Sequence, residues 1–266
     1  MSSYSQVPMS RSCPRPFFLI TLAILLIANH FSLTQEVKSR GGFRPLVMLT
    51  EFNPWAMVVG SDSPTFVLYE NGTVIYLRES TYFSTKLNPS EVESFVSGLG
   101  PDTLTRLKDS YQLSQASDQR TNVLVVRTDS TNYKEISIYG SIRSLKTESG
   151  KTSPNIPLPA ELIHALRRAL RYDNTKASAW MPEFIEVMIW PFDYAKGKVA
   201  AWPANWPELA DKKTVKHKEL YSLVVPESQY EQLKKFIAQL KPTQAVRIDG
   251  KKWAVSTRFP FPHETE

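Results

Sequence analysis

The stretch FVLYENGTVIYL, residues 66–77, gives the clearest indication of the fold. Two runs rich in β-branched and aromatic residues flank Asn71-Gly72, a dipeptide that accepts positive φ angles with little strain. We therefore expect a tight β-hairpin, with Asn71 and Gly72 at both central positions of its turn. Asn71-Gly72-Thr73 is also a glycosylation sequon, but turn formation explains these residues more simply.

A helix is predicted after this hairpin. Asn88 can cap its first turn, Pro89 suits that turn, and Gly98 and Gly100 mark its end. Its inward face is expected to hold Val92, Phe95, Val96 and Leu99. Farther along, the hydrophobic pattern predicts a hairpin at 123–139, a helix at 159–171, strands at 184–190 and 220–225, a helix at 227–240 and a last hairpin at 245–259.

Strands and helices are mixed without strict βαβ alternation, and hairpins dominate. This arrangement favours an α+β fold, a mostly antiparallel sheet of hairpins with about three amphipathic helices, preceded by an N-terminal hydrophobic segment. Residues 144–157 are polar and are broken by glycine and prolines. They divide the chain into a first half with a ββα unit, 43–143, and a second α/β half, 158–262, and the two halves can form one compact domain.

The N-terminus has the three parts of an export signal. Residues 1–16 carry Arg11 and Arg15 and no acid, Phe17 to Ala28 is a run of twelve uncharged residues, and the chain turns polar again from Asn29. Residues 1–34 are therefore expected to be either a cleaved signal peptide or an uncleaved signal anchor.

Both outcomes place the folded part outside the cytoplasm. An uncleaved segment would contact the membrane through residues 17–33, with the two arginines on the cytoplasmic side. The part from Phe43 onward is then periplasmic or otherwise extracytoplasmic, anchored in the cytoplasmic membrane or released.

The composition is that of a globular protein, with 42% hydrophobic and 22% charged residues. The net charge is +6, and it falls to +4 without residues 1–34. This mild basic excess suits anionic lipid or an acidic polymer, and it is too sparse for a nucleic-acid interface. The one cysteine, Cys13, precedes the apolar run, so the exported part contains neither disulfides nor reactive thiols.

Four aromatic residues within 190–207 form the first candidate site. Exposed tryptophans on irregular loops often contact sugars, peptides or proteins. The residues are Trp190, Tyr194, Trp202 and Trp206, the last two each followed by proline. The alternative interpretation, which we favour at this point, is that the rings fold back over the core.

Three carboxylates form the second candidate site. Glu186 interrupts the apolar run at 184–190, and burial would raise its pKa so that it could act as an acid, paired with Glu183 or Asp193. Alternation offers a simpler explanation, with Glu186 on the solvent side of an edge strand. Three scattered histidines do not indicate a metal site, and no cofactor motif or standard catalytic motif occurs.

Three runs carry a resemblance to known proteins. FVLYENGTVIY at 66–76, FIEVMIWPFDY at 184–194 and DGKKWAVSTRFPFPHE at 249–264 resemble segments of uncharacterised exported bacterial proteins. The resemblance implies a hairpin-and-helix body behind an N-terminal signal or anchor, and it implies no activity.

The sequence therefore leaves the molecular function open. The first hypothesis is a non-enzymatic cell-envelope protein that binds an envelope protein or a polysaccharide through the aromatic residues of 190–207. The alternatives are an unrecognised hydrolase that uses a pair of carboxylates, and a membrane-tethered structural or assembly factor. Neither a cofactor nor a nucleic-acid partner is expected.

Overall fold

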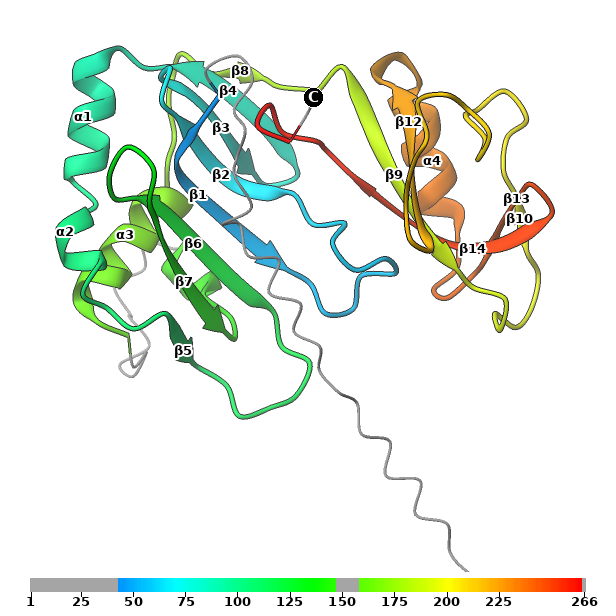
Figure 1. Ribbon diagram of the computed structural model, residues 1–266, viewed down its shortest axis with the longest axis horizontal. Helices are drawn as coiled ribbons and strands as arrows, with labels where there is room; N and C mark the ends of the chain where they lie inside the picture. The colour runs from blue at the N-terminus through cyan, green and yellow to red at the C-terminus, as the bar shows by residue number, and fades with distance from the viewer. Residues whose placement is uncertain (1–42, 147–157, 265–266) are drawn as a thin grey trace, which may run out of the picture. The chain divides into compact units, whose positions relative to one another are not determined.

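The computed structural model of the chain describes residues 43–146 and 158–264 (Figure 1). The chain divides into a unit of residues 1–35, none of which is described, and a unit of residues 36–266. The predicted signal or anchor, residues 1–34, therefore lies outside the described residues. The second unit contains two β-sheets, which we name sheet A and sheet B.

Sheet A has eight strands in the order β5-β7-β6-β1-β2-β3-β4-β8. All its pairings are antiparallel except that of β5 with β7. The strands are β1 (Pro45–Phe52), β2 (Pro64–Tyr69), β3 (Thr73–Arg78), β4 (Thr81–Lys86), β5 (Ser110–Gln112), β6 (Thr121–Arg127), β7 (Tyr133–Tyr139) and β8 (Ser178–Ala179).

The β2–β3 hairpin confirms the prediction at residues 66–77, but the predicted turn type is wrong. The connection has three residues, and the Gly72 amide donates to the Tyr69 carbonyl at 2.9 Å. Gly72 has φ +82°, whereas Asn71 is not among the residues with positive φ. The Asn71 side chain instead accepts a hydrogen bond from the Thr73 amide at 2.9 Å, which holds the turn without a left-handed asparagine.

Helices cover one face of sheet A. The N-terminus of α1 (Pro89–Ser97) has the expected Asn88 cap, and a reciprocal bond from the Asn88 amide to Glu91 completes a capping box. A short helix α2 (Pro101–Leu104), a turn of 3₁₀ helix η1 (Arg143–Leu145) and α3 (Ala160–Leu170) complete this layer (Figure 1). Their buried side chains include Phe95, Leu104, Leu145, Leu162 and Leu166.

The other face of sheet A is also buried. Its side chains alternate with those under the helices, and they include Met48, Tyr69 and Ile75. Phe261, which follows the last strand of sheet B, is completely buried in this layer. His263 lies 2.8 Å from the Tyr69 hydroxyl in a hydrogen bond. The end of the described chain thus completes the core of sheet A.

Sheet B has six strands in the order β10-β13-β14-β9-β12-β11. The β10–β13 pairing is parallel and the others are antiparallel. The strands are β9 (Phe184–Pro191), β10 (Ala200–Ala201), β11 (Val215–His217), β12 (Leu220–Pro226), β13 (Val246–Ile248) and β14 (Lys251–Arg258).

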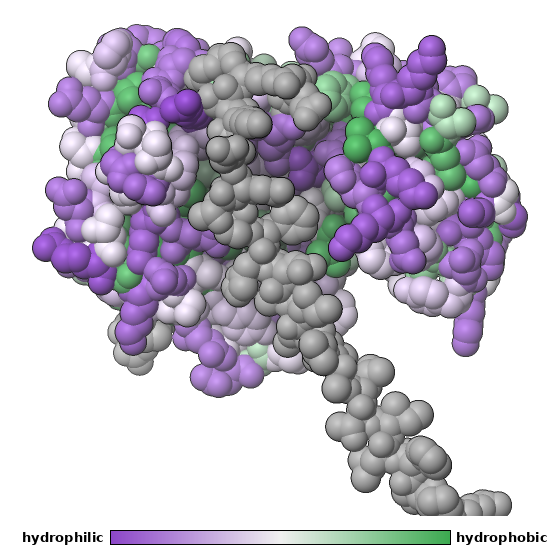
Figure 2. Space-filling model, viewed as in Figure 1, coloured by the Kyte–Doolittle hydropathy of each residue, from purple (hydrophilic) through white to green (hydrophobic). Residues whose placement is uncertain are grey.

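One face of sheet B packs on the helix α4 (Tyr230–Gln239), which follows the 3₁₀ turn η2 (Glu227–Gln229). Ile185, Val187 and Ile189 of β9 point to this side together with Leu233 of α4. Polar and charged side chains cover most of the face seen in Figure 2, as the composition leads one to expect.

The α+β class with mostly antiparallel pairing is confirmed, and three of the described helices have nine or more residues. The change from one sheet to the other comes between Ala179 and Phe184. Helix α3 and strand β8 therefore belong with sheet A, although both fall within the half expected to run from 158 to 262. Residues 147–157, within the expected boundary loop, lie outside the described residues.

Candidate functional site

Trp202 and Trp206 are part of the core of sheet B. Their side chains are 9% and 4% exposed, and both pack edge-to-face on Phe236 of α4. The two indole rings lie 4.8 Å apart, and Trp202 Nε1 donates to the Pro207 carbonyl at 2.9 Å. Because both rings are buried against each other and against α4, they leave little surface on which a ligand could stack.

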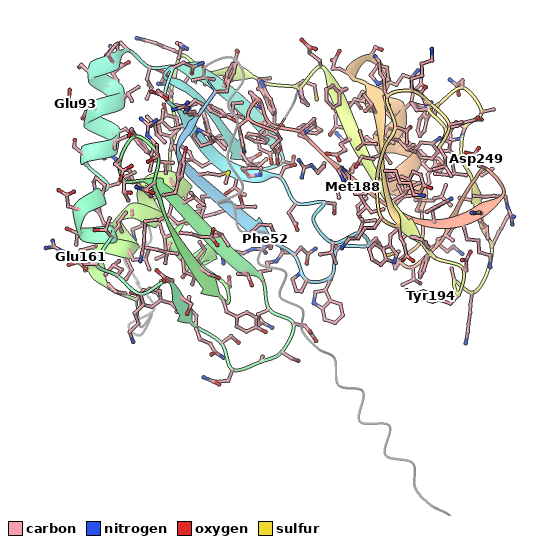
Figure 3. All side chains as sticks on the ribbon, in the orientation of Figure 1. Phe52, Glu93, Glu161, Met188, Tyr194 and Asp249 are labelled. Carbon is pink, nitrogen blue, oxygen red and sulfur yellow. The ribbon has the colours of Figure 1, made fainter. Side chains whose placement is uncertain are left out.

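Trp190 and Tyr194 are exposed, at 44% and 77%. On β9, Trp190 alternates with Ile189, so it points away from α4 and from the buried tryptophans. Tyr194 lies in the loop after β9, where its ring packs edge-to-face on Phe192 at 4.9 Å (Figure 3). The structure therefore separates the four predicted aromatic residues into a buried pair and an exposed pair.

The three candidate carboxylates are not brought together as an acid pair. Glu186 lies on β9 between β14 and β12, so its strand is not the edge strand that we expected. Its carboxylate is 2.8 Å from Arg258, which also contacts Glu264 at 2.7 Å. Glu183 and Asp193 lie beyond opposite ends of β9, whose eight residues span about 26 Å at the usual rise.

A segment that the sequence analysis did not single out carries exposed apolar side chains. The connection from β1 to β2, residues 53–63, exposes Trp55 by 72% and Val59 by 81%, with Met57 at 37%. The available signal was the composition of FNPWAMVVGSDSP at 52–64, in which apolar residues lie between prolines, glycine and small polar residues. The prolines, glycine and small polar residues predict a loop. Because a loop has no buried strand or helix face, its apolar side chains can remain exposed.

Hydrogen bonds hold this connection in a defined conformation. Asn53 accepts a bond from the Trp55 amide at 3.2 Å, and its own amide donates to Asp62 at 3.3 Å. Trp55 Nε1 donates to the Asp118 carbonyl at 3.2 Å. Burial raises the pKa of the Asp62 carboxyl, and the Asn53 amide opposes this shift. The exposed side chains are therefore presented by an ordered loop.

The connection rests on the second face of sheet B. Val58 is buried in a cluster with Met188, Phe192 and Ala254, and its amide donates to Ser256 Oγ at 3.1 Å. Met188 and Trp190 share a face of β9, and Trp190 is paired with Ala254 of β14. The segment that carries Trp55, Met57 and Val59 thus packs, through Val58, on β9 and on the loop after it, which carry the exposed pair. We name the set Trp55, Met57, Val59, Trp190 and Tyr194 the apolar surface.

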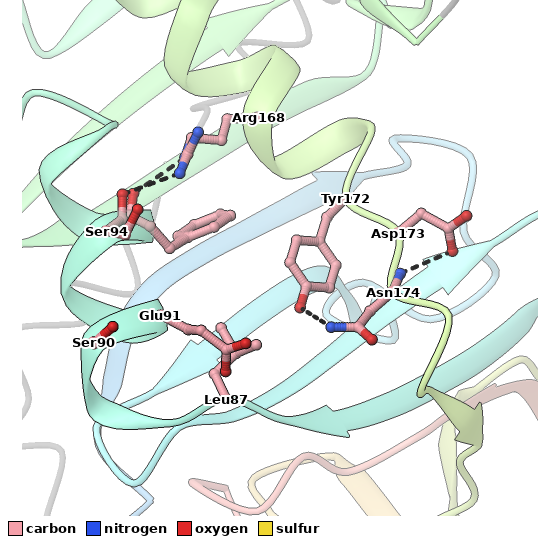
Figure 4. Close-up of a pocket in the computed structure, with 9 residues that line it drawn as sticks. Leu87, Ser90, Glu91, Ser94, Arg168, Tyr172, Asp173 and Asn174 are labelled. Carbon is pink, nitrogen blue, oxygen red and sulfur yellow. Dashed lines mark hydrogen bonds between the residues drawn. The ribbon is translucent and has the colours of Figure 1, made fainter.

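Two depressions lie away from the apolar surface. One, of about 350 Å³, is formed by α1 and the end of α3, where Arg168 donates to the Ser94 and Phe95 carbonyls and Tyr172 lies between Glu91 and Asp173 (Figure 4). The other, of about 290 Å³, is lined by Trp206 and Phe236 and by residues that include three with amide side chains. In the first depression, Glu91, Arg168 and Asp173 are engaged in contacts that build the fold.

The charge is distributed unevenly between the two sheets. The described residues up to 175 carry 13 lysines and arginines and 13 acids, so they are neutral. Residues 176–264 carry 14 lysines and arginines against 10 acids, a net charge of +4. Among the described residues, no three histidine, cysteine, aspartate or glutamate side chains come together in a way that could hold a metal ion.

Comparisons with protein-family models, with curated proteins and with solved structures return no significant match. Among residues 43–146 and 158–264, no helix has the length and hydrophobicity needed to cross a membrane.

Proposed function

We propose that the chain is a non-enzymatic cell-envelope protein that acts by binding, and that the apolar surface is its contact site. The observation that carries this proposal is the exposure of Trp55, Val59 and Tyr194, each more than 70% open to solvent. Eight large hydrophobic side chains of the described residues are exposed, and the five of the apolar surface lie on two neighbouring segments. Apolar side chains gathered in this way are typical of contact sites.

The carboxylates support binding over hydrolysis. An acid catalyst needs a carboxyl that is open to a substrate and a second group within about 5–10 Å. Glu186 is instead held by Arg258, which also contacts Glu264. Its surroundings are those of a structural ion pair.

The envelope location rests on the sequence of residues 1–34. Full-length protein made in a bacterial host is separated into soluble, periplasmic and membrane fractions, and its N-terminus is sequenced. An intact N-terminus in the membrane fraction means a retained anchor, and cleavage near Gln35 means a released protein. Full-length protein in the cytoplasmic fraction would overturn the envelope assignment.

Binding is tested by photo-crosslinking of the exported protein in the host. Benzoylphenylalanine replaces Val59 or Tyr194 in separate variants, and Glu93, exposed on α1, is the matched control position. We expect adducts at 59 and 194 and background labelling at 93. Labelling at background level at all three positions, or equal labelling at all three, would show that the apolar surface is not a contact site.

A further inference from the structure

We infer that the apolar surface docks on an anionic lipid bilayer. This inference rests on the proposed function and names the partner of its contact site. Two observations carry it: the kinds of side chain in the apolar surface, and the lysines beside Trp190 and Tyr194.

The side chains are those that favour the boundary between lipid and water. Tryptophan and tyrosine combine an apolar ring with a polar tip, and they are enriched where headgroups meet acyl chains. Trp55 uses its indole N–H within the protein, on the Asp118 carbonyl, which leaves its ring as the exposed part. Met57 and Val59 add purely apolar groups on the same ordered loop.

Lysines lie beside the exposed aromatic residues. Lys196 and Lys198 are exposed on the loop that carries Tyr194. Lys252 shares its face of β14 with Ala254, the partner of Trp190, and its ammonium group donates to the Ala195 carbonyl at 3.2 Å. Asp193 is the one acid between Tyr194 and β9.

The net charge of the part of the chain that carries these lysines is consistent with this pattern. The net charge of +4 falls on residues 176–264, whereas the earlier described residues are neutral. A lysine or arginine near an anionic membrane strengthens binding by about fivefold. Positive charge beside Trp190 and Tyr194 is therefore complementary to a bilayer with acidic headgroups.

The test measures the position of single side chains relative to lipid, using the full-length chain. Cys13, the only cysteine, is replaced by serine, and single cysteines at Val59, Tyr194 and Glu93 carry a nitroxide label. The protein is reconstituted in vesicles of phosphatidylcholine, with or without phosphatidylglycerol. Collision of each label with oxygen, which concentrates in lipid, is compared with collision with a water-soluble nickel complex.

On vesicles with phosphatidylglycerol, we expect the oxygen-to-nickel ratio to rise at 59 and 194 and to stay low at 93. The double variant Lys196→Glu/Lys198→Glu should reduce the docked-to-undocked ratio by at least about fivefold for each lysine. Lys234→Glu/Lys235→Glu makes the same charge change on α4, on the opposite face of sheet B, and should have a small effect.

Three results would overturn the inference. Labels at 59 and 194 that collide with nickel as often as the label at 93, while the photo-crosslinks persist, mean that the partner is a protein or a polymer, and the proposed function then survives. Protection from both reagents means that residues 1–42 or a second copy of the chain cover the surface. A rise that is equal in the two kinds of vesicle and unchanged by the lysine variants removes the anionic headgroup from the explanation.

Discussion

The two sheets differ in how their second faces are covered. In sheet A, the face away from the helices is filled by large buried side chains and is completed by Phe261, which has no exposed area. In sheet B, the face away from α4 is covered only in part, because Val58 of the β1–β2 connection packs on Met188 while Trp190 stays open. A face that folding leaves partly open is available to another molecule, and in this chain that face belongs to the positively charged half.

The largest expected effect on stability is found by comparing substitutions on the second faces of sheets A and B, the faces away from the helices. Phe261→Ala removes a fully buried ring, and we expect it to reduce the free energy of unfolding by about 3–5 kcal/mol. Trp190→Ala removes a ring of similar size from the open face and should cost less than about 1 kcal/mol. Urea denaturation of both variants and of the unchanged chain measures the difference. Equal losses would mean that the second face of sheet B is as well packed as that of sheet A.

The next prediction compares the loss of stability when a glycine is replaced in one hairpin turn of each sheet. Gly72 and Gly250 both have positive φ, at +82° and +77°. An alanine Cβ at 72 would lie 2.4 Å from the Leu87 carbonyl oxygen, whereas at 250 it would meet no atom within 4 Å. Gly250→Ala should therefore cost only the left-handed backbone strain, about 1–2 kcal/mol.

Gly72→Ala should cost more than Gly250→Ala, because the backbone of the β4–α1 junction must move as well. Thermal unfolding of the two variants checks this order. The reverse order would show that the β2–β3 turn relaxes freely and that sheet A is the more tolerant of the two.

Arg258 joins two carboxylates at the end of sheet B. Arg258→Met leaves Glu186 and Glu264 without their shared cation, and both are mostly shielded from water. We expect a loss of about 2 kcal/mol, below the value for fully buried pairs because all three groups keep some solvent contact. In Glu186→Gln/Arg258→Met, part of the loss should be recovered, which a double-mutant cycle in urea would reveal. No coupling in that cycle would contradict the ion pair.

The smallest effect depends on pH and concerns His263. Burial lowers the pKa of this imidazole, with Arg258 acting in the same direction and Glu264 opposing it. The unfolded chain therefore takes up a proton near pH 6.5 that the folded chain resists, so the free energy of unfolding should fall as the pH drops below about 6.5.

His263→Gln should remove this part of the pH dependence, at most about 1.4 kcal/mol for each pH unit. The measurement is the difference between the urea stabilities of the two proteins from pH 7 to pH 5. Tyr69, the hydrogen-bond partner of His263, has its own pKa raised by burial and stays neutral over this range. Parallel curves would mean that His263 protonates without cost in the folded protein.

Local patterns predicted several elements of this fold, but not β1, which lies in the middle of sheet A, or β4. Asn88, Pro89 and Gly98 placed α1, the apolar run at 184–190 placed β9, and the predicted last hairpin placed β14, because each of these signals acts within a few residues. The turn at Gly72 was predicted at the right place, but not its type, because Asn71 holds the turn through its side chain and does not adopt a positive φ angle.

The candidate site depended on contacts between distant residues. Trp202 and Trp190 look alike in sequence, yet one packs on α4 and the other points to the opposite face of the sheet. The candidate site at Trp55 was not predicted, because it depends on the packing of its loop on sheet B. Val58 of that loop packs on β9, a strand about 130 residues later in the chain. Which tryptophan is buried, and which loop packs on sheet B, cannot be predicted until the order of strands in that sheet is known.

The path of the chain has a consequence for the kinetics of folding. β1 lies in the middle of sheet A and is the first described strand to be synthesised, while Phe261, which completes the same core, comes after every strand of sheet B. Closing a core across more than 200 residues gives a high contact order, and such topologies fold slowly. During synthesis, sheet A would keep one hydrophobic face uncovered until sheet B had emerged. A chaperone that binds exposed hydrophobic surface would therefore act on sheet A and not on sheet B.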